Sequence, residues 1–530
     1  MTAMYDGEWV LSSFLDDRAE KLGDKIALSS HTGELSYGAL RDRAQRLAGG
    51  LAGLGVQPGD RVATMLDPTI DHVACWFGTA WAGAVEVPVN TDYKGTFLEH
   101  ILRESGASVL IVEDRWVDRL APLDLPELRH VVVVGSYPGA TSSHGVDLHA
   151  LEALESGSPV APVPRTEQDL TYILYTSGTT GPSKGVMHSG GSALWTAKVW
   201  VDMMQLTEDD VAYSMLPLFH VTARSAATTA NMWAGGATVL RSRFTASGFW
   251  DDVRSVGATN FMYMGAVITL LAAQEPKPDD LDNSMRMGGG AAAPPHLRDM
   301  FRERFGVELI EVFGMTEIGT ATGPLPGRPS PPGTMGKPFD HLQIEIHDED
   351  DNPVAPDIPG EIVVRPARSN AIFKGYWGNP EATVEAWRNL WFHTGDRGTM
   401  SPEGGVTFID RIKDSLRRRG ENISSFEVER SVNGHPAVLE CAAYAVKSEL
   451  TDDEVMVAVV LQEGATIEPE ELFRYCIDCM PRFAVPRYVR VMDELPKTPT
   501  NRVQKHVLRD HGVTDDTADR EAMGIEVPRS

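Results

Sequence analysis

The sequence is that of a long, acidic chain whose composition, 42% hydrophobic and 23% charged residues, is typical of a globular protein. Its 530 residues exceed what one hydrophobic core usually organises, so two or more domains are expected. The net charge of −27 at pH 7 argues against a nucleic acid or an anionic membrane as the main partner, and a local basic patch must hold any anionic ligand.

The sequence contains no strong signal for targeting or membrane insertion. Aliphatic runs such as 131–134 are too short to cross a bilayer, so no transmembrane segment is expected. The first fifteen residues lack the basic start and the small-residue cleavage site of a signal peptide. Four cysteines do not make a disulfide framework in a chain of this length. The cytoplasm is therefore the expected compartment.

The first 135 residues alternate between helical and strand patterns. Apolar residues recur every three or four positions over 40–54, which predicts an amphipathic helix that Ser36 caps. A turn and a strand at Arg61–Leu66 follow, and the alternation continues through 77–90 and 101–135. This order predicts a parallel α/β arrangement.

The segment TSGTTGPSKG (176–185) follows a buried strand predicted at Thr171–Tyr175. Glycines expose backbone N–H groups, and the hydroxyls and Lys184 add further donors, so the loop suits a polyphosphate. It is not a Walker A loop, because position 183 is Ser where that motif requires Gly. A flexible linker is the alternative, which the preceding strand disfavours. A helix is expected from about Ser192.

The character of the chain changes near residue 410. A basic run at 411–420 precedes shorter helix and strand patterns, so we expect an N-terminal domain over 1–410 and a C-terminal domain over 411–530. The polar tail after about residue 512 is expected to be disordered. Cys476 and Cys479 form a CxxC pair, but with Leu472 they follow helical spacing, which favours core packing over a redox or zinc role.

Several further motifs follow the phosphate loop in a fixed order. They are PLFHVTA (217–223), GGGAAAPP (288–295), VFGMTE (312–317), FHTGD (392–396), DRIKDSLRRRGENIS (410–424) and PKTPTNRVQK (496–505). In this order, over about residues 10–510, they resemble the adenylate-forming superfamily of acyl-CoA synthetases, luciferases and nonribosomal adenylation domains. VPVNTDYKG (87–95), FKGYWGNPEAT (373–383) and RRRGENISSFEVE (417–429) are most similar to its crotonobetaine/carnitine-CoA ligase-like branch.

This resemblance implies an α/β fold, in which a large multi-subdomain N-terminal domain with layered sheets carries a small, mobile α+β C-terminal domain. It also implies adenylation, in which a carboxylate attacks the α-phosphate of ATP and expels pyrophosphate. Such a reaction needs charge neutralisation and in-line positioning more than covalent chemistry. Coenzyme A is the implied acceptor in the second step.

The resemblance assigns nucleotide-binding roles to several residues. Lys184 and the loop hydroxyls would hold the β- and γ-phosphates, Thr316 the α-phosphate, and Glu317 a magnesium ion. Asp396, supported by Arg411, would accept hydrogen bonds from the ribose hydroxyls. Gly289, Gly290 and Ala291 would form a flat wall against adenine. As alternatives, Asp396 is a turn residue and Glu317 a solvated carboxylate at a helix start. The expected nucleotide-binding residues are Thr176, Ser177, Gly178, Thr179, Thr180, Gly181, Gly289, Gly290, Ala291, Phe313, Gly314, Asp396, Arg411, Lys413, Arg417, Arg419 and Gly420.

The acid would lie beside the second motif of the series. The expected pocket residues are His220, Val221, Arg224, Tyr263, Gly265, Met315 and Thr320. His220 would close the pocket; alternatively it is a buried structural histidine. Arg224 shares a helical face with His220 if the segment is helical. Facing the pocket, Arg224 would select a second anionic group or a small oxyanion; facing outward, it is a surface charge.

The resemblance places Lys413 at the hinge on which the C-terminal domain turns between an adenylating pose and one that admits the thiol of coenzyme A. Five cations fall within 411–419. They predict a patch for the phosphates of coenzyme A, and a solvated helix face is the alternative.

The final motif departs from the family pattern. The family usually has Gly-Lys where this chain has Asn501-Arg502, and the planar guanidinium of Arg is not equivalent to the compact ammonium of Lys. Three alternatives follow. Arg502 replaces the family's lysine, Lys505 reaches the site instead, or the first step is slow or handles an unusual acid.

Three functions are therefore compatible with the sequence. The first is an ATP- and magnesium-dependent acid–CoA ligase. The second is adenylation of another oxyacid such as nitrite, with a non-CoA acceptor such as an aryl amine. The third is a catalytically weakened nucleotide-binding relative. The expected partner is a small-molecule acid and not a nucleic acid, and a homodimer is compatible with the sequence.

Overall fold

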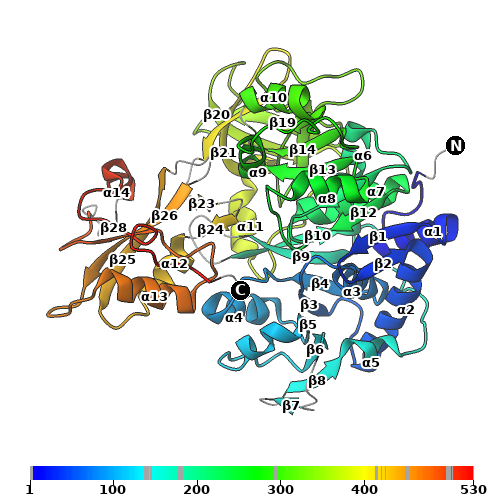
Figure 1. Ribbon diagram of the computed structural model, residues 1–530, viewed down its shortest axis with the longest axis horizontal. Helices are drawn as coiled ribbons and strands as arrows, with labels where there is room; N and C mark the ends of the chain where they lie inside the picture. The colour runs from blue at the N-terminus through cyan, green and yellow to red at the C-terminus, as the bar shows by residue number, and fades with distance from the viewer. Residues whose placement is uncertain are drawn as a thin grey trace.

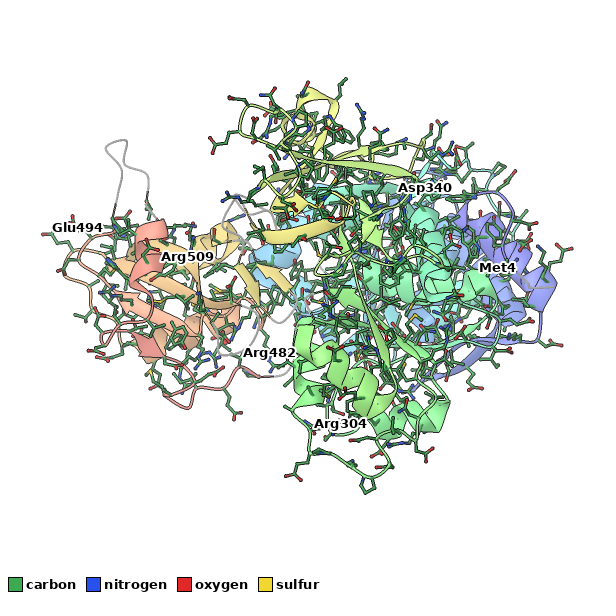
Figure 2. All side chains as sticks on the ribbon, turned by 90° about the horizontal axis from the view of Figure 1, so that it is seen from above. Met4, Arg304, Asp340, Arg482, Glu494 and Arg509 are labelled. Atoms are coloured by element: carbon green, nitrogen blue, oxygen red, sulfur yellow. The ribbon has the colours of Figure 1, made fainter. Side chains whose placement is uncertain are left out.

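The computed structural model has two parts, a large body and a smaller lobe (Figure 1). The lobe holds the elements from β23 onward, and Figure 2 shows Arg482 at its junction with the body. No helix in the described part of the chain combines the length and apolar character that a membrane crossing requires. The structure describes residues 4–136, 142–143, 146–176, 183–291, 293, 295–411, 416–418, 421–423, 425–447, 453–496, 503 and 505–528.

One large sheet carries the predicted phosphate loop. Its strand order is β10-β9-β4-β3-β5-β6-β8-β7, and the pairs from β9 to β8 are parallel, which confirms the predicted α/β arrangement. β10 runs antiparallel to β9, and Lys184 lies opposite Thr176 at the loop's base. The strands are β3 (Arg61–Met65), β4 (Val85–Pro88), β5 (Val109–Glu113), β6 (His130–Val134), β7 (Ser142–Ser143), β8 (Val146–Ala150), β9 (Leu170–Thr176) and β10 (Lys184–Ser189).

A second large sheet provides a wall of glycines. Its order is β15-β14-β13-β11-β12-β1-β2, parallel except for β1 with β2. Gly288–Gly290 on β14 leave one stretch of this sheet without side chains. The strands are β1 (Ile26–Ser30), β2 (Gly33–Ser36), β11 (Val211–Ser214), β12 (Ala237–Leu240), β13 (Asn260–Met264), β14 (Met287–Ala291) and β15 (Glu308–Glu311).

Local sequence signals account for several of the helices in the body. Ser36 caps α2, because its side chain accepts a hydrogen bond from the Ala39 N–H, as predicted. α6 begins at Gly190, near the predicted start, and the capping box of Ser189 and Ser192 fixes that end. The helices are α1 (Leu11–Leu22), α2 (Tyr37–Gly53), α3 (Ile70–Trp81), α4 (Gly95–Ser105), η1 (Asp114–Leu120), α5 (Leu151–Glu155), α6 (Gly190–Met204), η2 (Thr222–Thr229), α7 (Ala230–Ala234), α8 (Phe249–Val256), α9 (Gly265–Ala272), α10 (Pro295–Phe305), α11 (Pro380–Ala386) and η3 (Arg388–Leu390).

Smaller sheets complete the body. The orders are β16-β17-β18 and β19-β20-β21-β22. These strands are β16 (Phe313–Met315), β17 (Gly319–Gly323), β18 (Lys337–Pro338), β19 (Leu342–His347), β20 (Gly360–Pro366), β21 (Phe392–Met400) and β22 (Val406–Arg411).

The lobe has its own sheet, and the chain's tail is part of it. Its order is β25-β26-β27-β28. The tail was expected to be disordered, and this was wrong for residues 513–528, because β28 pairs with β27 and Ile525 is buried. Leu472 and Cys476 are buried on α13, in agreement with the core packing predicted for the CxxC segment. The elements are β23 (Leu416–Arg418), β24 (Glu421–Ile423), α12 (Ser425–Val432), β25 (Val438–Lys447), β26 (Asp453–Leu461), α13 (Pro469–Cys479), β27 (Tyr488–Val491), α14 (Lys505–His511) and β28 (Ala518–Asp519).

A buried ion pair connects the two large sheets. Arg224 lies in η2, a π-helix that packs on β11 and β13, and its side chain is fully buried. Its guanidinium makes two contacts with Glu86 on β4, one of them Nη2 to Oε1 at 3.1 Å, and stacks over Trp76 at 4.2 Å. Arg224 therefore faces neither a pocket nor solvent, and both sequence interpretations of it were wrong. The periodicity that suggested them assumes an α-helix.

The carboxyl of Glu86 is ionised in this environment. Burial alone would raise its pKa, but the Arg224 guanidinium, together with His72, outweighs burial and lowers the pKa to about 2. Each charge is thus stabilised by the other, and neither is stable there alone.

We expect Glu86→Gln to destabilise the body strongly, because it leaves the Arg224 charge buried without a counter-charge. Breaking a buried pair in this way typically lowers the free energy of unfolding by about 3–5 kcal/mol. The shift of the urea midpoint at which the body unfolds measures this loss of stability. The control is Asp202→Asn, which breaks the half-exposed Lys198–Asp202 pair and should change stability by less than about 1 kcal/mol. Equal effects would show that the Glu86–Arg224 pair does not hold the sheets together.

A second prediction concerns His188, which is buried on β10 with Nδ1 3.2 Å from the Ser192 Oγ. Burial lowers its pKa from 6.5 to about 3, so the folded protein resists a proton that the unfolded chain accepts. This contribution to stability is complete above pH 6.5 and is lost as the pH falls from 6.5 to about 3. Urea unfolding over this range should show a shallower pH dependence for His188→Asn than for the wild type. Identical slopes would contradict the assignment.

Candidate active site

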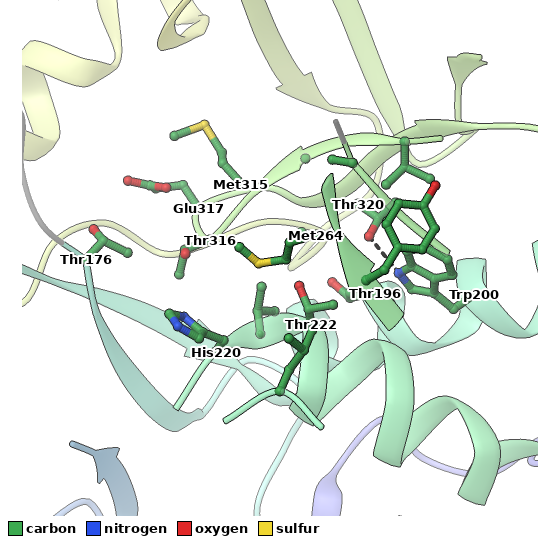
Figure 3. A pocket seen from close by; sticks show the side chains of 18 residues that line it. Thr176, Thr196, Trp200, His220, Thr222, Met264, Met315, Thr316, Glu317 and Thr320 are labelled. Atoms are coloured by element: carbon green, nitrogen blue, oxygen red, sulfur yellow. Dashed lines mark hydrogen bonds between the residues drawn. The ribbon is translucent and has the colours of Figure 1, made fainter. Parts of the chain in front are cut away.

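A cavity of about 230 Å³ lies between β13, β14, β16 and β17, the middle of α6 and the start of η2 (Figure 3). It brings together predicted residues from both the nucleotide-binding and the acid-binding sets. Those that line it are Thr176, His220, Val221, Tyr263, Gly290, Ala291, Gly314, Met315, Thr316, Glu317 and Thr320. Segments separated by more than a hundred residues thus form one site.

One end of the cavity is charged. Thr176, His220, Thr316 and Glu317 lie together there in Figure 3. Glu317 is buried, and its Oε1 accepts a hydrogen bond of 2.9 Å from the hydroxyl of Tyr376. Glu317 therefore has a fixed orientation, which excludes the alternative of a solvated carboxylate.

Tyr376 also connects Glu317 to the phosphate loop. The Nζ of Lys184 lies 5.0 Å from the centre of the Tyr376 ring. Burial, and then the charge of Glu317, raise the pKa of Tyr376 far above its usual value, so the hydroxyl keeps its proton and stays a donor. Sequence reasoning missed this residue, although it stands within the quoted segment 373–383. Lys184 does not itself line the cavity among the described residues.

The glycine segment of β14 divides between two roles. Gly290 and Ala291 line the cavity, whereas Gly289 packs against Trp200, since a Cβ at Gly289 would lie 2.2 Å from that indole. A Cβ at Gly290 would lie 2.2 Å from the backbone oxygen of Tyr263, so no side chain fits there either. Of the three residues predicted to lie against adenine, Gly290 and Ala291 therefore border the cavity and Gly289 does not.

Asp396 lies outside the cavity lining. It is buried on β21, and its backbone pairs in register with Arg411 on β22. This register brings together the two residues predicted to act at the ribose. The turn-residue alternative for Asp396 was wrong, because the residue lies within a strand.

Contacts from the smaller lobe reach the charged end. The Oε1 of Glu421 on β24 lies 3.4 Å from the Nε2 of His220. Glu427 on α12 accepts from the backbone N–H of Ser183 at 3.1 Å and from its hydroxyl at 2.8 Å, at the end of the phosphate loop. Burial raises the pKa of Glu427, and the two bonds from Ser183 oppose that rise. The lobe thus touches both the loop and the cavity.

Two further cavities lead from the charged end toward the lobe. A smaller one of about 50 Å³ shares Thr176, His220 and Thr316 with the first and extends to Glu421. A larger one of about 800 Å³ continues from Glu421 to Arg482 and the tail. Glu421 and His220 therefore stand between the large cavity at the lobe and the candidate site.

Lys505 is held inside the lobe in this conformation. Its Nζ lies 2.6 Å from the Oε1 of Glu429 and 2.8 Å from the Oγ of Ser425, both on α12. It does not line the cavity among the described residues.

Other predicted residues take different places. Phe313 packs in the core beside the cavity, and Gly265 begins α9 without lining it among the described residues. Ser177, Gly178, Thr179, Thr180, Gly181, Lys413, Arg419, Gly420 and Arg502 lie outside the described residues, as do the side chains of Arg411 and Arg417.

Sequence reasoning also missed the far end of the cavity. Trp200 and Thr196 on α6 and Thr222 at the start of η2 line it, together with Leu216, Met264, Val312 and Gly319. α6 was predicted only as a helix after the phosphate loop. Nothing in its periodicity distinguishes a residue of the cavity wall from one of the core.

Comparisons with known proteins agree with this geometry. Residues 15–377 match the family model of the AMP-binding enzyme, and residues 427–502 match that of the AMP-binding enzyme C-terminal domain. A crotonobetaine/carnitine–CoA ligase from Salmonella paratyphi A is 31% identical over 511 residues, which cover 94% of this chain and 98% of the relative. One from Salmonella typhi is 30% identical over 512 residues, with the same coverage.

Solved structures give the same result. An anthranilate CoA ligase in complex with anthranoyl-AMP superposes with a TM-score of 0.72 at 25% identity, covering 96% of this chain and 98% of its own. An o-succinylbenzoate CoA synthetase from Bacillus subtilis superposes with a TM-score of 0.81 at 25% identity, covering 94% and 98%. The matches span the body and the lobe together, and they lead to one conclusion: the chain belongs to the AMP-binding enzyme family, whose members are adenylate-forming ligases.

Proposed function

We propose that the protein is an acid–CoA ligase, which joins a small carboxylic acid to AMP and then transfers the acyl group to coenzyme A. The observation that carries the proposal is the cavity itself. It places Thr316 and Glu317, a flat wall at Gly290 and Ala291, and His220 around one space. A nucleotide and a carboxylate can be held side by side in such a space, as the first step requires.

The nucleotide would lie toward the charged end. Lys184, at the base of the phosphate loop, would bind the β- and γ-phosphates, and Thr316 the α-phosphate. Glu317 fits a magnesium ion as a hard, oriented carboxylate, and such an ion would neutralise phosphate charge. No group of three or more His, Cys, Asp or Glu side chains in the described part of the chain could hold a metal alone, so the phosphates and water would complete its coordination.

The acceptor would arrive through the two cavities that lead from the lobe. Each cavity shares at least one residue with the next one along the route, and His220 stands at the last junction with Glu421 of the lobe beside it. A thiol that follows this route meets the acyl-adenylate from the side opposite the far end of the cavity. His220 would then act as the gate between the acceptor route and the acid.

The described conformation corresponds to the second step. Glu427 accepts two hydrogen bonds from Ser183 of the phosphate loop, donors that a polyphosphate would otherwise use, and Lys505 is paired inside the lobe. We infer that the lobe turns about a hinge near Lys413 for the first step. The domain boundary would then lie after Arg411, the last residue of β22.

The oxyacid alternative receives no specific support. It rested on Arg224 as a cation in the pocket, and the charge of Arg224 is neutralised by Glu86 beneath the site. A carboxylic acid therefore remains the proposed substrate.

Exchange of radiolabelled pyrophosphate into ATP tests the first step. Exchange should depend on an added acid and on magnesium, and Glu317→Gln should lower it by about 10²–10³, because one charged group is lost from the transition state. The control is Glu345→Gln on β19, an exposed carboxylate remote from the cavity that should leave exchange unchanged. Exchange with no acid of a broad panel would contradict the proposed function.

Arg502 and Lys505 can be separated by half-reaction. We expect Arg502→Ala to lower adenylation by about 10²–10³ and to leave the reaction of coenzyme A with a preformed acyl-adenylate nearly unchanged. Lys505→Ala should affect adenylation less, since Lys505 is engaged by Glu429 in the lobe. Arg502→Lys is the conservative control and should keep the activity. A defect confined to Lys505→Ala would instead assign the catalytic cation to Lys505.

A further inference from the structure

The far end of the candidate cavity is closed by a fixed indole. Trp200 is 2% exposed, and its Nε1 donates a hydrogen bond of 2.8 Å to the Oγ1 of Thr320 (Figure 3). The opposite edge of its ring packs against Gly289, where a Cβ would lie 2.2 Å away. The indole is therefore held on both sides and cannot move aside for a longer ligand.

The neighbouring wall is equally fixed. Gly319 has a φ of 63°, and a Cβ there would lie 2.2 Å from the Oγ1 of Thr196. The backbone of β17 thus packs directly on α6. Because this contact leaves no space behind the wall, the acid cannot extend between the helix and the strand.

The space between these walls is small. The whole cavity, including its charged end, has about 230 Å³, which is below the roughly 300–1,000 Å³ of sites for drug-sized ligands. Part of it serves the nucleotide at Gly290 and Ala291. What remains suits a compact acid and excludes a fatty acyl chain.

The closed end is also polar. Thr196, Thr222 and Thr320 line it, and no charged side chain lines this end among the described residues. Thr196 donates to the Ser192 backbone oxygen at 3.3 Å, so it presents acceptor lone pairs. Thr320 accepts from Trp200, so its own O–H can donate. This end of the cavity therefore has a hydroxyl that can donate and a hydroxyl that can accept a hydrogen bond.

From this geometry we propose that the acid is compact and carries an uncharged hydrogen-bonding group, a hydroxyl or an amine, at the end remote from its carboxylate. The proposal rests on the proposed function and names its substrate class, the size of a substituted benzoate or smaller. Trp200 and Thr320 are the residues that determine specificity. No carboxylate among the described residues of this end could pair with the permanent positive charge of a carnitine-like acid, so such acids are disfavoured.

The test compares para-hydroxybenzoate, benzoate, octanoate and carnitine by acid-dependent pyrophosphate exchange. The wild type should prefer para-hydroxybenzoate to benzoate by about tenfold in kcat/KM and should show little exchange with octanoate or carnitine. Thr320→Val should reduce this preference to less than about threefold, because a methyl replaces the hydrogen-bonding group. The control is Thr238→Val, at a buried threonine on β12 whose hydroxyl has no hydrogen-bond partner among the described residues. It should leave the preference intact.

A second variant tests the length limit. Trp200→Ala should allow octanoate to react, with a gain of about fourfold in kcat/KM for each methylene that enters the new space. Wild-type exchange that favours octanoate or carnitine, or an unchanged preference in Thr320→Val, would overturn the proposal.

Thermal shift in the presence of AMP separates this inference from the proposed function. If the wild type is stabilised by para-hydroxybenzoate more than by benzoate, and Thr320→Val is not, the acid class stands even when exchange is absent. In that case the proposed ligase reaction is contradicted, but the proposed acid-binding site is supported. No stabilisation by para-hydroxybenzoate together with no exchange would overturn both.

Discussion

The ion pair of Arg224 with Glu86 is the constraint on which the site depends. Glu86 belongs to the sheet that carries the phosphate loop, and Arg224 to the π-helix that packs on the glycine-bearing sheet. The guanidinium also donates to the Leu218 backbone oxygen at 3.0 Å, so it holds the segment that ends at His220. One buried pair thus fixes the two sheets and the loop between them. Misplacing it would move every wall of the cavity.

The sequence predicted what depends on local chemistry and on the order of motifs. The Ser36 cap, the strand before the phosphate loop and the helix at Cys476 follow from spacing and residue type alone. Thr316 and Glu317 were found because motif residues of a known family keep their order along the chain. For these features, a window of a few residues holds the whole physical cause.

The remaining features depend on contacts between distant segments. Arg224 was misjudged because η2 follows a π and not an α periodicity, and because its partner Glu86 is 138 residues away. Tyr376 and Trp200 were not predicted for a related reason. The sequence does not distinguish an aromatic residue of the core from one that the fold places beside a carboxylate or a threonine of the site. The tail was misjudged because β28 pairs with β27 and the side chains of Arg520 and Ile525 are buried, despite its polar composition.

The π-helix has a consequence for how this pocket can change over time. Thr228 and Thr229 donate their hydroxyls to backbone oxygens five residues earlier, at 2.9 Å each, and so support the wider turn. Loss of a single residue from this segment would restore the α-helical turn and rotate Thr222 away from the cavity, while the ion pair at Arg224 resists such a rotation. Insertions and deletions, rather than substitutions, are therefore the changes that this wall tolerates least, and a chain with a shorter segment here would have to line the cavity with a different set of side chains.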